Sequence, residues 1–279
     1  MFVYQSRLLK RGEVWFDQEP EPVPVDWIYY RQRPNPIANG RWRPFYTRLI
    51  DLAKSAAELK AEMEERTVRK IKEAVERDGT RWERRDAGQP GLLDEVQSMW
   101  NRFALAQHTP PLDRVWLDQL AAVGALEVGV AKDPVGDVLV YQLNYVAAKR
   151  AQQLIAVARY LAVPNAAMRM TINRANCLGH WSHMLALKER GIRSFDFGGW
   201  YPGTTDIRLL GMNAFKRGFG GYIVREFECE QILTLKGWAV LTVGRILHQL
   251  KNPRFARNRL ASELSNATLK DCQVSAAFR

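Results

Sequence analysis

The stretch "FDFGGWYPGTTDIRLLGMNAFKRGFGG" runs from Phe195 to Gly221 and decides how the fold is interpreted. It contains too much glycine for one helix, because glycine destabilises helix interiors. It also carries more aromatic side chains than a surface loop needs. "FDFGG" predicts a short strand, "TDIRLLGMNAFKRG" a short helix, and "GYIVREFECEQIL" a further strand. We interpret the stretch as a site in which Asp196, Lys216 and the paired glycines are the polar and conformational features.

Working outward from this stretch, alternating apolar patterns and turn residues predict a mixed succession of elements. Ser55 and Glu58 form a predicted capping box at the start of a helix, and Asp78-Gly79 predicts its end. Asn173 or Asn176 is the predicted cap of a strong later helix that stops at Gly191. The expected elements are short strands within 1–54, helices over 55–79, 92–107, 112–123 and 173–191, and strands over 125–131, 137–146 and 153–161.

Composition predicts a globular protein with a basic surface. The chain has 279 residues, a net charge of +11 and 47% hydrophobic residues. Such a surplus favours polyanionic partners, namely nucleic acid, anionic lipid or phosphorylated substrates, although a basic surface with no such partner is the alternative. The cysteines show no metal-ligand spacing and suit a reducing compartment. With no signal-peptide pattern and no apolar run of about 18 residues, we expect a cytoplasmic protein.

Three regions are expected along the chain. Residues 1–54 form N-terminal strands and connectors, residues 55–235 the main domain, and residues 236–279 a basic amphipathic tail. Within this tail, residues 236–259 combine an apolar helix face, which includes Trp238, with lysine and arginine side chains. That pattern predicts peripheral contact with the inner face of an anionic membrane, and the alternative is a helix docked on the domain.

Three motifs occur in order in the second half of the chain. An asparagine precedes a helix bearing a tryptophan in "NRANCLGHWSHMLALKERG", a strand reads "FDFGG", and "FKRGFGG" follows. This arrangement resembles the FemAB-like branch of the GNAT acyltransferase superfamily, over about residues 170–230. The resemblance implies an α/β fold with a GNAT-like mixed, twisted sheet flanked by helices. An N-terminal strand and helix extension and a C-terminal basic helix would flank it.

The resemblance also implies an activity. It suggests N-acyl transfer from acyl-CoA to the amine of a phosphorylated sugar, such as a sugar nucleotide, or of a lipid-linked cell-envelope precursor. An aminoacyl-tRNA donor, with tRNA as a partner, is one alternative. A GNAT-fold scaffold at the membrane that has lost its chemistry is another. The glycine loop that usually binds the coenzyme A pyrophosphate is missing, and no metal is expected.

Site residues follow from the resemblance and from the chemistry of acyl transfer. The acyl chain is expected between the strands 153–161 and 194–198, where freed backbone amides face a carbonyl oxygen. Phe215 is predicted to pack on the donor, and Lys216 to stabilise the oxyanion or bind a donor phosphate. Asp196 either accepts a proton or holds the acceptor amine, and its alternative role is to cap backbone amides beside the Gly198-Gly199 turn.

The remaining predicted substrate-binding residues lie on the helix before the "FDFGG" strand. Asn173, Arg174 and Asn176 are expected near the donor phosphates at the helix start. His180 and Trp181 are included as substrate contacts, with a packed histidine as the alternative. Gly198 and Gly199 are predicted to let the backbone approach substrate, or simply to make the turn.

Overall fold

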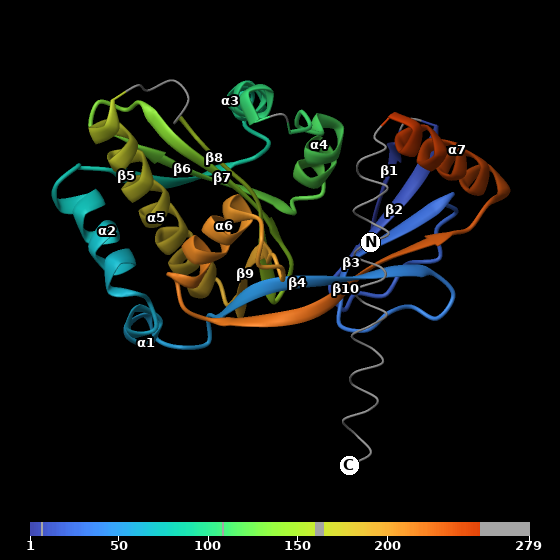
Figure 1. The fold of residues 1–279 in the computed structure, drawn as a ribbon, viewed down its shortest axis with the longest axis horizontal. Coiled ribbons are helices and arrows are strands. Elements are labelled where there is room, and N and C mark those ends of the chain that lie inside the picture. Colours follow the sequence, from blue (N-terminus) through green and yellow to red (C-terminus); the bar gives the residue numbers. More distant parts are fainter. Residues whose placement is uncertain (7, 108, 160–164, 252–279) are drawn as a thin grey trace, which may run out of the picture.

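The computed structural model describes residues 1–6, 8–107, 109–159 and 165–251. Ten strands and seven helices form within these ranges (Figure 1). The strands are β1 (Phe2–Ser6), β2 (Leu9–Trp15), β3 (Trp27–Arg33), β4 (Arg41–Asp51), β5 (Arg81–Asp86), β6 (Leu126–Lys132), β7 (Val138–Val146), β8 (Arg150–Ala158), β9 (Ser194–Gly199) and β10 (Tyr222–Ile232). The helices are α1 (Ala56–Ala61), α2 (Glu65–Glu76), α3 (Leu92–Gln107), α4 (Arg114–Ala122), α5 (Ala166–Glu189), α6 (Ile207–Arg217) and α7 (Leu235–Lys251).

The ten strands hydrogen-bond into one mixed sheet in the order β1-β2-β3-β10-β4-β9-β8-β7-β6-β5. Only the pairs β2–β3 and β8–β9 are parallel. The long strands β4 and β10 pair with each other over most of their length and span the middle of the molecule in Figure 1. The α/β class and the mixed sheet predicted from the sequence are thereby confirmed.

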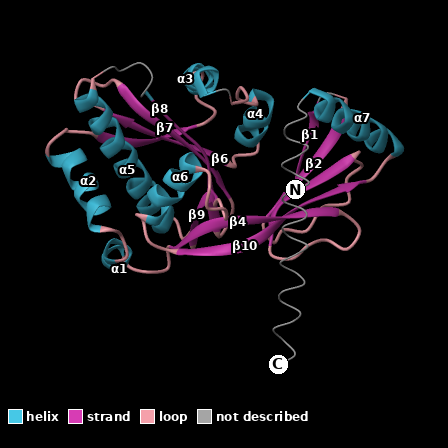
Figure 2. Ribbon diagram, in the orientation of Figure 1, coloured by secondary structure: helices cyan, strands magenta, loops and turns pink. Residues whose placement is uncertain are grey.

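The two largest hydrophobic clusters among the described residues pack helices against the sheet. One joins α3 and α4 to strands β6–β8, and its members include Val96, Leu117 and Leu143. The other joins α1, α2 and α5 to β4 and β9, and includes Leu178 and Phe195. Figure 2 shows α2 and α5 side by side, apart from α3 and α4. Because side chains alternate along a strand, neighbouring residues of β9 belong to different surroundings on its two faces.

Local sequence signals explain several element ends. The capping box is confirmed, because Ser55 Oγ accepts from the Glu58 N–H and the Glu58 carboxylate accepts from the Ser55 N–H. Gly79 has a φ of +63°, which fits the predicted left-handed stop. The single helix predicted over 55–79 is wrong. Its backbone turns at Glu64, which is extended and donates its N–H to the Gly218 carbonyl at 2.9 Å, so two helices form.

The long helix α5 begins earlier than predicted. Its N-cap is Asn165, whose side chain accepts from the Ala167 N–H at 2.8 Å. Asn173 and Asn176 therefore lie inside the helix, and their prediction as caps is wrong. The stop at Gly191 is confirmed by its φ of +82°. The helix thus presents two further turns ahead of the residues on which the motif rests.

The N-terminal strands share the sheet of the main domain, because β4 pairs with both β9 and β10. The boundaries at residues 54 and 235 stay predictions. Helix α7 begins where Thr234 Oγ1 accepts from the Gly237 N–H and donates to Asp26. It contacts β2, and residues 252–279 of the predicted tail lie outside the described residues. No described helix is both long and apolar enough to cross a bilayer.

Candidate active site

The strands β8 and β9 pair for only three residues and then separate. Their parallel register runs from Arg150↔Ser194 to Gln152↔Asp196. Beyond it, Gly198 adopts a φ of +67°, and a Cβ there would lie 3.0 Å from the Gln153 carbonyl oxygen. Glycine is therefore needed where β9 turns away from β8. The strand separation confirms the sequence expectation that these two strands lie side by side and then part.

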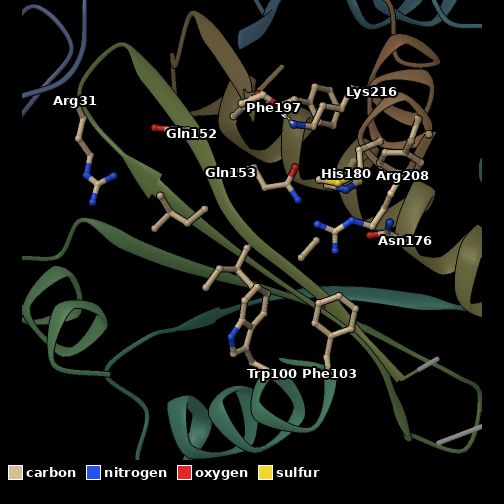
Figure 3. Close-up of a pocket in the computed structure, with 18 of the residues that line it drawn as sticks. Arg31, Trp100, Phe103, Gln152, Gln153, Asn176, His180, Phe197, Arg208 and Lys216 are labelled. Carbon is tan, nitrogen blue, oxygen red and sulfur yellow. Dashed lines mark hydrogen bonds between the residues drawn. The ribbon is translucent and has the colours of Figure 1, made fainter. Parts of the chain in front are cut away.

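A cavity of about 770 Å³ lies at this separation. Five consecutive β8 residues, 152–156, contribute to its wall. Because alternate residues of a strand point to opposite faces, the cavity reaches both faces of β8. One face of α6, including Arg208 and Lys216, forms part of the wall (Figure 3). The other lining groups come from α5 (Asn173, Asn176, His180), β9 (Phe197, Gly198, Gly199), α6 (Gly211, Met212, Phe215), β2 and β3 (Trp15, Arg31), and α3 and α4 (Trp100, Phe103, Trp116).

Lys216 is a buried cation at the end of the strand gap. Its Nζ donates to the carbonyl oxygen of Gly198 at 3.1 Å and to that of Gly199. Burial lowers the pKa of its ammonium group to about 8, against an opposing effect of the Asp196 charge. The group is therefore mostly protonated at neutral pH and carries its charge next to the cavity. That arrangement suits stabilisation of a developing negative charge.

His180 of α5 is surrounded by aromatic side chains. The ring centroids of Phe197, Phe215 and Phe219 lie 5.2, 5.5 and 5.5 Å from its own. Its Nε2 has no hydrogen-bond partner among the described residues. Burial, with smaller contributions from His183 and Lys216, lowers the pKa of His180 to about 3. A neutral imidazole with so low a pKa is a weak proton acceptor, which favours the packed role over that of a base.

The pKa of His180 predicts how the protein responds to acid. The unfolded chain binds a proton near pH 6.5 and the folded chain only near pH 3, so stability falls as pH drops through this window. At pH 4.5 the loss from this residue is about 3 kcal/mol. We expect His180→Phe to remove that part of the loss, measured by urea unfolding at pH 7 and 4.5. Between pH 7 and 8 the free energy of unfolding should change equally little in both proteins. If it also changed equally between pH 7 and 4.5, the result would contradict a buried neutral imidazole.

Asp196 lies beneath the site and is fully buried. Its carboxylate accepts hydrogen bonds from Thr47 Oγ1 and from the Gly198 N–H, and pairs with Arg150. Gln32 Nε2 donates to the same carboxylate at 2.7 Å. With its oxygens occupied and no exposed surface, Asp196 has the geometry of the structural alternative, a carboxylate that caps the Gly198 amide and organises the turn.

Seven of the ten predicted site residues line the cavity, and three do not. Arg174 is turned away and pairs with Asp78 through two hydrogen bonds, one of them 2.8 Å long. Trp181 packs against the hydrophobic core that includes Leu178. Asp196 lies below the cavity wall. Asn176 does face the cavity, and its Oδ1 accepts from Gln142 Nε2 at 3.0 Å, which leaves its amide N–H groups available.

The sequence prediction did not include several lining residues. Arg208 stands at the first turn of α6, and no ion pair engages it within the described ranges. Figure 3 shows it together with Asn176 and His180 at one side of the cavity, while Trp100 and Phe103 lie at another. Arg208 lies two residues after the Asp206 cap, where the helix dipole disfavours a cation. This unfavourable position could have marked Arg208 as a candidate site residue. No local pattern connects α3 with the strand gap, so its rings could not be assigned.

Metal binding finds no support in the observed geometry. Among the described residues, no three histidine, cysteine or acidic side chains gather closely enough to hold an ion. His183, the neighbour of His180 on α5, instead contacts Asn144 Nδ2 at 3.0 Å and Glu127 at 3.4 Å. Cys177 and Cys229 are buried free thiols. The absence of a metal requirement stays a prediction.

Comparisons with known proteins bear on the fold. No protein-family model matches the chain, and no curated protein matches it in sequence. Among solved structures, FemX has 18% identity over 67% of this chain and 61% of its own length, with a TM-score of 0.54. This chain therefore spans less than two thirds of FemX.

Two further structures align less closely. The C-terminal domain of a putative lysylphosphatidylglycerol synthetase from Agrobacterium fabrum has 17% identity over 77% of this chain and 71% of its own, with a TM-score of 0.48. A tandem GNAT protein from the clavulanic acid biosynthesis pathway has 12% identity over 74% and 64%, with a TM-score of 0.39. The likeness to FemX shows that the chain has a FemX-like fold.

Proposed function

We propose that the protein is an N-acyltransferase that moves an acyl group from a thioester donor, acyl-CoA, to an amine. The observation that carries this proposal is the gap between β8 and β9, which opens after three residue pairs and ends at the buried cation of Lys216. An acyl carbonyl in the gap has the positive charge of Lys216 beside it. The FemX-like fold is consistent with this chemistry.

The reaction needs no covalent enzyme intermediate. The amine lone pair attacks the thioester carbonyl carbon, a C–N bond forms, and the carbonyl oxygen becomes an oxyanion. The protonated Lys216 stabilises that charge more than it stabilises the neutral carbonyl, which is the condition for catalysis. When the C–S bond breaks, the thiolate takes the proton that the amine loses. The products are an amide and a thiol.

The donor is proposed to bind where α5 and α6 meet the cavity. Arg208 supplies a cation with no partner among the described residues, and Asn176 supplies amide N–H groups. Asn173, one turn away, also lines this wall. These groups suit the phosphates of coenzyme A, since guanidinium and amide donors are common phosphate ligands.

Transfer is tested directly with purified full-length protein. Acetyl-CoA and longer acyl-CoA donors are offered with phosphorylated amino sugars, and the amide product is measured by mass spectrometry. We expect product that requires both substrates and forms about 100- to 1000-fold more slowly with Lys216→Met. A protein that binds donor yet gives no product with any acyl-CoA or aminoacyl-tRNA would contradict the proposal and favour the scaffold alternative.

An aminoacyl-tRNA donor is a second candidate, which the net charge of +11 and the missing glycine loop favour. Binding of tRNA would depend steeply on salt, because each phosphate contact releases counterions. The same assay therefore includes charged tRNA at low and high salt. Product with charged tRNA, and none with acyl-CoA, would move the proposal to an aminoacyl transferase.

Peripheral membrane contact through residues 236–259 remains a proposal, supported by the exposed apolar side of α7. Trp238 of this segment is 59% exposed, Leu235 just before it is 89% exposed, and apolar side chains near the helix end are also exposed. We expect Leu235→Ser with Trp238→Ser to lower binding to anionic vesicles about tenfold or more. Val135→Ser, another exposed apolar change, is the matched control. Equal sedimentation of all three proteins with vesicles would contradict the contact.

A further inference from the structure

The cavity has an aromatic half that the acyl-transfer proposal does not use. Trp100 and Phe103 project from α3, with ring centroids 5.6 Å apart, and line the cavity beside β8 (Figure 3). Trp100 is fixed in orientation, because its Nε1 donates to the Pro110 carbonyl at 3.1 Å. Trp116 of α4 completes this wall. Large rings that remain partly exposed in a cavity are a usual surface for binding a ring-bearing ligand.

Arg31 supplies a cation at the same half. Its guanidinium lies over the rings of Trp15 and Trp116, each at 5.0 Å, and its Nε donates to the buried carboxylate of Glu13. Trp116 Nε1 donates to that carboxylate as well, at 3.1 Å. The guanidinium thus lies close to both rings, its Nε is paired with Glu13, and its other N–H groups make no ion pair in the described structure.

The charges around Arg31 do not cancel. Glu13 also pairs with Arg11 at 3.0 Å, so one carboxylate faces two guanidinium groups. The next acidic group, Glu228, pairs with Arg43 instead. Within the described part of the chain, this leaves about one positive charge beside the cavity. A fixed guanidinium with spare donors is suited to a phosphate, which it can bind through two parallel hydrogen bonds.

A bulge in β3 explains why Arg31 reaches the cavity. Phe227 of β10 pairs with Arg33, but Cys229 pairs with Tyr30, so β3 has one residue more than its partner here. Gln32, inside the bulge, has a φ of +53° and is buried. Such bulges change the direction of neighbouring side chains and are common beside active sites. The N-terminal strands therefore build part of the same site.

We propose that this half of the cavity is the acceptor subsite and binds a phosphorylated amino sugar. The sugar ring packs against Trp100 and Phe103, and its phosphate binds Arg31. The proposal rests on the proposed N-acyltransferase function, because it places the acceptor opposite the donor groups on α5 and α6. The amine then enters the strand gap from this side, toward Lys216.

Binding of glucosamine 1-phosphate, measured by calorimetry without any donor, tests the subsite. We expect the wild-type protein to bind it, and glucosamine without the phosphate to bind at least about tenfold more weakly. Arg31→Gln should weaken binding of glucosamine 1-phosphate about 10- to 100-fold and leave coenzyme A binding unchanged. Arg43→Gln removes the same charge from β4, which lies outside the cavity and is separated from β3 by β10, and should change neither affinity.

A second variant separates ring contact from charge and guards against misfolding. Phe103→Leu should weaken binding of glucosamine 1-phosphate and leave that of inorganic phosphate unaltered, in protein whose thermal unfolding matches the wild type. Equal effects of Arg31→Gln and Arg43→Gln, or equal affinity with and without the phosphate, would overturn the subsite. If amide still forms on a phosphate-free amine in that case, the proposed function stands. Tight binding of the sugar phosphate with no transfer would contradict the proposed N-acyltransferase function and support the binding subsite.

Discussion

Replacing Lys216 with methionine is expected to lower the rate of acyl transfer about 100- to 1000-fold, the usual cost of losing one oxyanion donor. The chain should still fold, because the change removes a buried charge whose desolvation already lowers its pKa to about 8. The lost hydrogen bonds to Gly198 and Gly199 and the relieved desolvation oppose each other. We expect the free energy of unfolding to change by less than about 2 kcal/mol. Steady-state kinetics and urea unfolding of the same preparations measure both quantities.

Arg217→Met is the matched control for Lys216. It removes a cation from the next residue of α6, but Arg217 is largely exposed and pairs with Glu64 across the surface. We expect wild-type rates in this variant. The wild-type rate constant should also decline as pH rises above about 8, where the Lys216 ammonium loses its proton. Equal losses in the two variants would show that the effect comes from general charge and not from the buried ammonium.

Asp196→Ala is expected to destabilise the fold by about 3–5 kcal/mol, because it breaks one side of a buried ion-pair network and leaves several buried donors without an acceptor. Arg150 would keep Glu226 as a partner, yet Gln32 and the Gly198 N–H would lose an acceptor inside the sheet. Urea or thermal unfolding measures the loss. Loss of Lys216 should remove activity and leave the fold intact, whereas loss of Asp196 should weaken the fold. This difference separates a catalytic role from a structural one.

Glu228→Ala is the control for Asp196. It also removes a carboxylate that pairs with an arginine, but Arg43 is 71% exposed and is solvated when its partner is lost. Tyr29 also loses the acceptor of its hydroxyl, so we expect a cost of about 1–2 kcal/mol, which is below that of Asp196→Ala. An Asp196→Ala protein as stable as the wild type but inactive would reverse the interpretation and return Asp196 to the chemistry, as the sequence alone also allowed.

Local signals were sufficient for much of the fold. The Ser55–Glu58 capping box and the glycine stop at Gly191 use neighbouring residues only, and the structure contains both. The order of β9, α6 and β10 followed from the glycine-rich stretch and its resemblance to known acyltransferases. The start of α5 could not be placed from sequence, because Asn165, Asn173 and Asn176 are all good capping residues and only Asn165 caps the helix.

The acceptor side of the cavity was beyond prediction for a different reason. Arg31 and Trp116 are 85 positions apart in the sequence and meet only because both contact Glu13. The direction of the Arg31 side chain depends on the bulge in β3, and no residue type near position 31 predicts that bulge. Asp196 shows a related limit. Its sequence context was compatible with chemistry or with support, and only its three-dimensional partners distinguish these roles.

The position of β10 in the sheet has a consequence for how the protein is made. β10 lies between β3 and β4, although it is the last strand of the sheet to be synthesised. Until residues 222–232 leave the ribosome, β3 has no neighbour on that side and β4 can pair only with β9. The N-terminal strands must therefore wait for almost the whole described chain, with open edges that invite pairing with other chains. Nascent chains that stop before residue 222 are accordingly natural clients for a chaperone.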